Sequence, residues 1–161
     1  MIGQDGVWAD LGAGGGLFTR ALVHLLSSES RVIAVDSDPA AVAALERLAA
    51  TSPTLTALQA DLTDFTAEVP LDGILLANSL HFVEHAGAVL ARLVTQLRPG
   101  GRVVLVEYDR RSASRWVPYP VAIGDLPALA TAAGLSKFTV VESRPSNYEG
   151  IIYAAVASLP T

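Results

Sequence analysis

The chain has 161 residues, of which 51% are hydrophobic, so it can form one packed domain over residues 1–161 and is not intrinsically disordered. It contains no cysteine, which excludes disulfides, a thiolate nucleophile and Cys-ligated zinc. The net charge of −5, without a Lys/Arg cluster, argues against a nucleic-acid partner. No apolar run reaches the ~18 residues of a membrane span, and no signal-peptide pattern is visible, so we expect a cytoplasmic protein.

The first third of the chain alternates short apolar runs with segments at helical spacing. Residues 7–11 predict a buried strand that ends in glycine-rich sequence, and residues 17–26 predict a helix. Residues 31–36 are rich in β-branched side chains and predict a central parallel strand. An N-cap aspartate and a first-turn proline then predict a helix over residues 39–50.

The middle of the chain continues this alternation. Residues 55–60 and 73–77 predict the third and fourth strands. Residues 84–97 predict a helix, which the Pro99-Gly100-Gly101 sequence is expected to end. Residues 102–107 predict the fifth strand.

The last third departs from the alternation. Residues 108–124 show no clear period, and residues 126–133 predict a short helix. Residues 138–143 and 151–157 predict two strands with only a turn between them, so this pair is expected to be antiparallel. Because strands separated by helices imply parallel crossovers, the sequence predicts an α/β, Rossmann-like, doubly wound sheet that ends with a reversed strand.

Glycines recur between the first predicted strand and the first predicted helix. Asp10, Gly12, Gly14 and Gly16 form an acidic-x-Gly-x-Gly-x-Gly pattern, in which glycine permits positive φ and lets a ligand approach the backbone. A dinucleotide fingerprint, Gly-x-Gly-x-x-Gly, would need a third glycine where this chain has Leu17. The pattern therefore argues against a nicotinamide dinucleotide.

Aspartates also follow the second and third predicted strands. Asp36 can accept paired hydrogen bonds from ribose hydroxyls, and Asp61 can accept from an exocyclic adenine amine. The carboxyl ends of parallel strands meet at one edge, where such sheets bind ligands. The alternative is a turn or N-cap aspartate, which is an equally good interpretation for Asp38 and Asp64.

Five segments resemble the successive motifs of class I S-adenosylmethionine-dependent methyltransferases: VWADLGAGGG, VIAVDSDP, LQADLTDF, LDGILLANSLHFVEH and LRPGGRVVLVEYD. The resemblance covers residues 7–157 and implies seven strands in the order 3-2-1-4-5-7-6, with strand 7 antiparallel. It implies an enzyme with S-adenosylmethionine as its cofactor. The cofactor-binding residues that it implies are Asp10, Gly12, Ala13, Gly14, Gly16, Asp36, Ser37, Asp61, Leu62, Asn78 and Ser79.

The family pattern also implies a part of the cofactor for each segment. Asp10 and the glycine loop would surround the methionine moiety, with Asn78 and Ser79 beside its amino acid end. Asp36 would bind the ribose. Asp61 would bind the adenine amine, with Leu62 beside the ring.

Methyl transfer from a sulfonium needs a general base only when the acceptor must lose a proton. His81, after the fourth strand, is the best-placed base, although packing or capping is an equally good role for it. Glu107, Tyr108 and Asp109 follow the fifth strand and are further candidates. His85 is expected to be exposed, and because no third ligand of suitable spacing accompanies the two histidines, no metal site is predicted.

Aromatic residues after the fifth strand are candidates for the acceptor site. We assign Tyr108, Trp116 and Tyr119 to substrate binding, with packing over the sheet edge as the alternative. A small-molecule acceptor is expected between the His81 loop and this segment. Few residues precede the first strand, so we expect no N-terminal lid, and a second subunit of a homodimer could close the site.

The sequence is also compatible with two other functions. One is a non-catalytic module that binds S-adenosylmethionine, and the other is a nicotinamide-dependent Rossmann enzyme. Ligand binding and turnover separate these from a methyltransferase.

Overall fold

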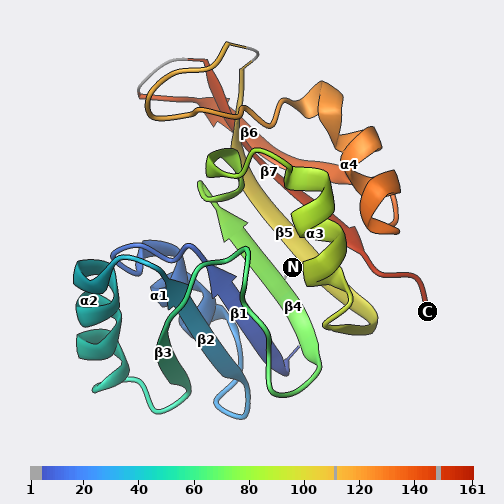
Figure 1. Ribbon diagram of the computed structural model, residues 1–161. Coiled ribbons are helices and arrows are strands. Elements are labelled where there is room, and N and C mark those ends of the chain that lie inside the picture. The colour runs from blue at the N-terminus through green and yellow to red at the C-terminus, as the bar shows by residue number, and fades with distance from the viewer. Residues whose placement is uncertain (1–4, 111, 148–149) are drawn as a thin grey trace.

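The computed structural model describes residues 5–110, 112–147 and 150–161. Its strands and helices alternate along most of the chain, as Figure 1 shows. The strands are β1 Val7–Leu11, β2 Arg31–Asp36, β3 Leu55–Gln59, β4 Leu71–Ala77, β5 Leu97–Asp109, β6 Thr139–Pro145 and β7 Ile151–Ser158. The α-helices are α1 Leu17–Leu25, α2 Pro39–Ala49, α3 Ala86–Val94 and α4 Leu126–Ala133, and the 3-10 turns are η1 Leu80–Phe82 and η2 Ile123–Asp125.

The seven strands form one sheet in the order β3-β2-β1-β4-β5-β7-β6. Strands β1 to β5 pair in parallel, whereas β7 pairs antiparallel with both β5 and β6. This confirms the predicted topology, including the reversed last strand. The strand order reverses between β1 and β4, so the loops that follow these two strands border a crevice suited to a ligand.

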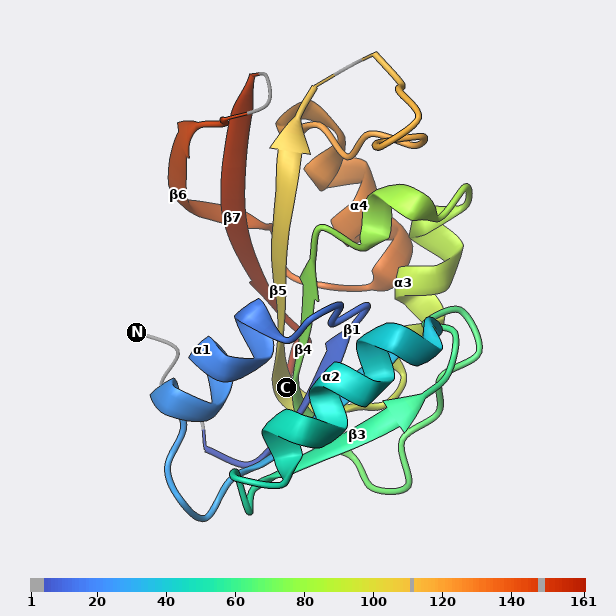
Figure 2. The ribbon, with the colours of Figure 1, turned by 90° about the vertical axis from the view of Figure 1, so that its left-hand side faces the viewer.

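Side chains alternate across the sheet and build a core on each face. Trp8 of β1 packs in one core with Leu22 of α1 and Leu45 of α2. The next residue, Ala9, faces the other core, in which Leu90 of α3 packs with residues of α4. Figure 2 shows α1 on one side of the sheet and α3 and α4 on the other. Both faces are thus covered, as a largely parallel sheet requires.

The prediction for the Pro99-Gly100-Gly101 sequence was wrong. The α3 helix ends earlier, at Val94, and β5 already begins at Leu97, which is buried and pairs with Leu71 of β4. The pairing resumes only at Arg102, so the glycines lie in an irregularity inside the strand. The N–H of Gly100 donates to the carbonyl of Leu159, a bond from the C-terminal segment that local sequence does not reveal.

Helix α3 also begins later than the predicted residue 84, at Ala86, and the 3-10 turn η1 precedes it.

Gly73 of β4 lies directly under the indole of Trp8. A Cβ at Gly73 would be 2.4 Å from the Trp8 ring, and the indole is fully buried, so it has no room to move. We expect Gly73→Ala to lower the free energy of unfolding by about 1–3 kcal/mol, measured by urea denaturation. The control is Gly124→Ala, because no heavy atom of the described residues comes within 4 Å of that Cβ. Equal stability of the two variants would contradict this packing.

Candidate functional site

The glycine loop after β1 is held against β2 by backbone hydrogen bonds. The N–H groups of Gly12 and Ala13 both donate to the carbonyl of Val35, each at 2.9 Å. Gly12, Gly14 and Gly16 all have positive φ. A Cβ at Gly12 would lie 2.5 Å from the Cβ of Ser79, so this close approach to the loop after β4 requires glycine.

Asp36, the last residue of β2, fixes the tip of this loop. Its Oδ2 accepts from the N–H of Gly14 at 2.8 Å, and its Oδ1 accepts from the N–H of Asp38 at 2.9 Å. A carboxylate has about four acceptor positions, so lone pairs remain for further donors. Asp36 therefore both shapes the loop and presents acceptor positions beside it.

Asp10, at the end of β1, is a buried carboxyl beneath the loop. It is 1% exposed, and its Oδ2 accepts from the hydroxyl of Thr19 at 2.6 Å. Burial, opposed by the Thr19 hydrogen bond and assisted by the charge of Asp36, raises the pKa of Asp10 to about 6. Asp10 thus carries an unfavourable buried charge at neutral pH.

This burial predicts a pH-dependent stability. Because folding raises the pKa of Asp10 from 3.8 to about 6, its stabilising contribution is complete below pH 3.8 and is lost as the pH rises through 6. We expect Asp10→Asn to raise the free energy of unfolding at pH 8 by about 1–2 kcal/mol and to flatten the change between pH 4 and 6, measured by urea denaturation. The exposed Asp64 provides the control, since Asp64→Asn should change neither quantity. An Asp10→Asn variant that is less stable than the wild type at pH 8 would contradict the prediction.

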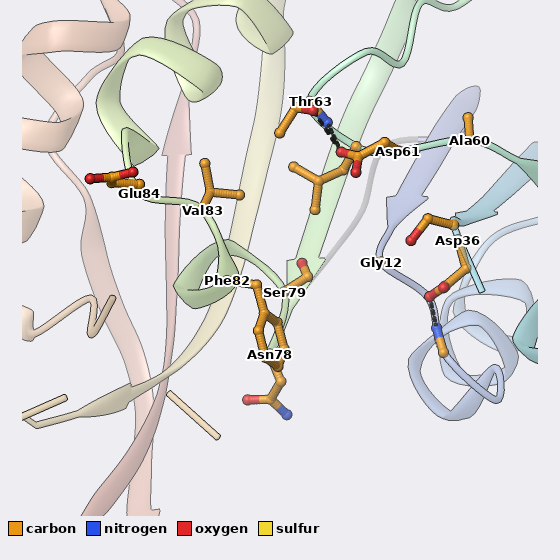
Figure 3. A pocket seen from close by; sticks show the side chains of 13 residues that line it. Gly12, Asp36, Ala60, Asp61, Thr63, Asn78, Ser79, Phe82, Val83 and Glu84 are labelled. Carbon is orange, nitrogen blue, oxygen red and sulfur yellow. Dashed lines mark hydrogen bonds between the residues drawn. The ribbon is translucent and has the colours of Figure 1, made fainter. Parts of the chain in front are cut away.

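A first cavity of about 510 Å³ opens at the carboxyl ends of β1, β2 and β4, as Figure 3 shows. Of the residues assigned from the sequence to the cofactor, it is lined by Gly12, Gly14, Asp36, Ser37, Asp61, Leu62, Asn78 and Ser79. Asp10, Ala13 and Gly16 are not among its lining residues; Asp10 belongs to β1, and Ala13 and Gly16 belong to the glycine loop. Sequence reasoning missed the remaining lining residues, which are Ala60, Thr63, Phe82, Val83 and Glu84.

Asp61 lies near the start of the loop after β3, and one of its carboxylate oxygens accepts hydrogen bonds within that loop. Its Oδ1 accepts from the hydroxyl of Thr63 at 2.7 Å and from the N–H of Thr63 at 2.8 Å, and these bonds hold its pKa below the usual value. Within the described part of the chain both hydrogen bonds use Oδ1, so Oδ2 is available to a ligand. A hydrogen-bond donor of a ligand in the first cavity would therefore face the charged carboxylate of Asp61 at this edge.

Helix α3 holds the loop after β3 in place, which the sequence did not reveal. The Arg92 guanidinium donates to the carbonyls of Leu62 and Phe65, at 3.0 and 2.7 Å. Gln96 adds hydrogen bonds to the same segment, at the carbonyl of Phe65 and the N–H of Ala67. These contacts span about thirty residues of sequence, so only the tertiary structure brings them together.

Three buried side-chain oxygens have no hydrogen-bond partner among the described residues. They are Oδ1 of Asp10, near the end of β1, and Oδ1 of Asn78 and Oγ of Ser79, in the loop after the adjacent strand β4. Asn78 also has a φ of 54°, which strains a residue with a side chain. Buried polar atoms are normally paired, so this cluster points to a polar ligand that supplies the missing bonds.

A second cavity of about 680 Å³ adjoins the first, because Asn78 and Phe82 line both. Its other lining residues are His81, Tyr108, Arg110, Ser114, Trp116 and Val117. This group includes Tyr108 and Trp116, which the sequence assigned to the substrate. Tyr119, the third aromatic residue of that assignment, is not among the lining residues.

His81, which lines the second cavity, forms a buried pair with Glu107, which is not among the lining residues. Nδ1 of His81 lies 2.6 Å from Oε2 of Glu107, and the N–H of His81 donates to Oε1 of Glu107 at 3.2 Å. His81 is 3% exposed and Glu107 is fully buried. Glu107 thus fixes the imidazole ring and engages Nδ1, which leaves Nε2 as the ring nitrogen available to a ligand.

The segment over the second cavity is anchored at several points. The N–H of Tyr119 donates to the carbonyl of His81 at 2.9 Å, so this residue braces the His81 turn through its backbone. The buried hydroxyl of Tyr153 donates to the carbonyl of Val121 at 2.8 Å, and Asp109 accepts from the N–H of Ile123.

The described residues hold neither a metal cluster nor a membrane helix. No group of three or more metal-ligating side chains lies close enough to hold an ion within this part of the chain. Over the same residues, no helix has the length and apolar character needed to cross a bilayer.

Comparison with known proteins places this arrangement in a family. A methyltransferase-domain family matches residues 9–103, more than half of the chain. Ribosomal RNA small subunit methyltransferase H of Nitrosococcus oceani is 40% identical over 68 residues, a stretch that covers 42% of this chain and only 22% of that protein.

Solved methyltransferase structures share the whole fold. The CurJ carbon methyltransferase is 19% identical with a TM-score of 0.81, over 100% of this chain and 50% of that chain. The 1,6-didemethyltoxoflavin-N1-methyltransferase of Burkholderia thailandensis, solved with its substrate and S-adenosylhomocysteine, is 26% identical with a TM-score of 0.76, over 99% of this chain and 73% of that one. The chain therefore belongs to the methyltransferase-domain family, and the predicted membership of the class I S-adenosylmethionine-dependent methyltransferases is confirmed.

Proposed function

We propose that this chain binds S-adenosylmethionine in the first cavity and transfers its methyl group to a small organic acceptor in the second. The observation that carries the proposal is the junction of the two cavities at Asn78 and Phe82, beside buried oxygens that lack partners among the described residues. Bound S-adenosylmethionine supplies a methyl carbon that is activated by its sulfonium, so that the acceptor atom bonds to this carbon as the carbon–sulfur bond breaks. The protein's own task is to bind, orient and exclude water.

The acidic lining of the first cavity suits this cofactor. Asp36 would accept from the ribose hydroxyls with the lone pairs that its loop contacts leave over, beside Ser37. Oδ2 of Asp61 would accept from the adenine amine, with Leu62 beside the ring. These roles are supported by the position of each side chain in the cavity.

The methionine end would lie between the loops after β1 and β4. The unpartnered oxygens of Asp10, Asn78 and Ser79 are acceptors that an ammonium group can satisfy. Gly12 and Gly14 line the cavity without a side chain, while Ala13 and Gly16 shape the loop behind them.

His81 would act as a general base when the acceptor releases a proton. Its Nε2 would take a proton from an O–H or N–H group in the second cavity, while the negative charge of Glu107 stabilises the resulting imidazolium. Tyr108 and Trp116 would hold the acceptor, and Tyr119 would support the His81 turn. A homodimer and a cytoplasmic location stay predictions, as does the exclusion of nucleic acid.

Calorimetry tests the proposal directly. We expect saturable binding of S-adenosylhomocysteine, the demethylated product, and no binding of NAD. Turnover of S-adenosylmethionine in the presence of small molecules from a cell extract then separates an enzyme from a non-catalytic module. Binding of NAD without S-adenosylhomocysteine would overturn the proposal.

A further inference from the structure

The second cavity offers a ligand aromatic surface rather than a free charge. Glu107 already engages the His81 ring, and Arg110 has an interaction of its own within the protein. Among the described residues that line the cavity there is no carboxylate. Phe82, by contrast, is 57% exposed and Trp116 is 74% exposed, although both are large apolar side chains. A ligand in this cavity would therefore gain affinity mainly by covering these two rings.

The rings that line the second cavity suit a flat ligand. The His81 ring lies 4.4 Å from the Phe82 ring and 6.0 Å from the Tyr108 ring, measured between centroids, and both pairs are tilted. The guanidinium carbon of Arg115 lies 5.4 Å from the centroid of the Trp116 ring, a cation–π arrangement that steadies the indole. Aromatic rings contact one another in offset or edge geometry, so a flat ring makes better contacts here than a puckered, saturated one.

One basic atom is accessible from this cavity. Nε2 of His81 takes part in no hydrogen bond with the described residues, yet it is not among the buried side-chain atoms that lack a partner. The atom is therefore not sealed off by protein. Because His81 lines the second cavity, a ligand bound there can reach Nε2.

A neutral imidazole helps most when the attacking atom of the acceptor holds a proton that it does not readily lose. The hydroxyl of a phenol has a pKa of about 10, so it is protonated at neutral pH and attacks poorly until the proton leaves. An aromatic amine attacks with a lone pair that is already free, and an aromatic thiol is largely ionised at neutral pH. Among these three groups, the hydroxyl gains most from Nε2 of His81.

We propose that the acceptor is an aromatic ring that carries a hydroxyl group, bound against Phe82 and Trp116, and that its oxygen receives the methyl group. This inference rests on the proposed function, because it concerns the acceptor of that same site. As the phenolic oxygen bonds to the methyl carbon, the carbon–sulfur bond breaks and its electron pair stays on sulfur. The hydroxyl proton moves to Nε2 of His81, so the positive charge of the sulfonium ends on an imidazolium beside Glu107.

A matched pair of probes tests the aromatic requirement. Calorimetry in saturating S-adenosylhomocysteine would compare 2-naphthol with decahydro-2-naphthol, which keeps the hydroxyl but is saturated and puckered. We expect 2-naphthol to bind about tenfold more tightly, the factor that corresponds to one or two aromatic contacts. Trp116→Ala should remove most of this preference and leave binding of S-adenosylhomocysteine unchanged.

The control variant is Leu25→Ala, because Leu25 is also a largely exposed apolar side chain, lies on α1 and lines neither cavity. It should leave the affinities for both probes unchanged.

Methyl transfer tests the target atom. The wild-type chain should convert 2-naphthol to 2-methoxynaphthalene when S-adenosylmethionine is present. At neutral pH, His81→Ala should lower transfer to 2-naphthol about 100-fold more than transfer to 2-naphthalenethiol, because the thiol has already lost its proton. A role of His81 in packing alone would lower transfer to both probes by the same factor.

The outcomes separate this inference from the proposed function. If S-adenosylhomocysteine binds normally but the saturated probe binds as tightly as 2-naphthol, or neither probe binds, the acceptor class is wrong and the proposed function stands. If 2-naphthol binds without being methylated, or His81→Ala affects the thiol equally, the assignment of oxygen is wrong. If S-adenosylhomocysteine does not bind the wild-type chain, the proposed function fails and this inference fails with it.

Discussion

His81→Ala is expected to lower the rate of methyl transfer by about 10²–10⁴-fold when the acceptor loses a proton, while the affinity for S-adenosylhomocysteine stays unchanged. The reason is geometric. The His81 ring lines the second cavity and Glu107 engages its Nδ1, so Nε2 is the basic atom that faces an acceptor. Turnover with an acceptor found in a cell extract gives the rate, and calorimetry gives the affinity.

His85→Ala is the matched control, since His85 lies four residues later and is exposed. It should keep the wild-type rate. A His81→Ala variant that folds, binds S-adenosylhomocysteine and also keeps the wild-type rate would show that His81 is not the base.

The Glu107→Gln variant tests whether Glu107 contributes its charge to the His81–Glu107 pair or only its shape. Glu107 accepts from the backbone N–H of His81 with one oxygen and contacts Nδ1 with the other. Glutamine has the same shape but only one oxygen, so it cannot accept both bonds and leaves no charge to stabilise an imidazolium. We expect a slower rate and an altered pH–rate profile, with binding of S-adenosylhomocysteine preserved. An unchanged profile would assign Glu107 a structural role only.

Asp36→Ala is expected to weaken S-adenosylhomocysteine binding by about 1–3 kcal/mol, which is roughly 5–150-fold in Kd. Two effects act in the same direction. The ribose hydroxyls lose a charged acceptor, and the N–H of Gly14 loses the oxygen that fixes the glycine loop. Calorimetry at fixed pH and salt measures the change.

Asp38→Ala provides the comparison for this effect. Asp38 is an exposed aspartate two residues away that caps helix α2 through the N–H of Ala40. Its loss should lower stability by about 0.5–2 kcal/mol and leave the affinity unchanged. If Asp36→Ala binds S-adenosylhomocysteine as the wild type does, Asp36 does not contact the ribose.

The sequence by itself determined those strands and helices whose hydrophobic pattern can be recognised within a few consecutive residues. The strands at Val7–Leu11 and Arg31–Asp36 and the helix at Leu126–Ala133 have the predicted bounds, because apolar runs and periodicity are local signals. The helix expected to run to Pro99-Gly100-Gly101 ends at Val94, and this sequence lies inside β5. That boundary depends on the pairing of Leu97 with Leu71, a contact between segments far apart in sequence.

The same division holds at the site. The sequence by itself placed Asp36 and Asp61 after neighbouring strands, because the carboxyl ends of parallel strands meet at one edge. Only the tertiary structure decided that His81 contacts Glu107, 26 residues away, and that Arg92 holds the loop after β3. The pattern of a strand predicts at which end of the sheet a side chain lies. The residue that it contacts depends on how neighbouring strands and helices pack, and the local sequence does not contain this information.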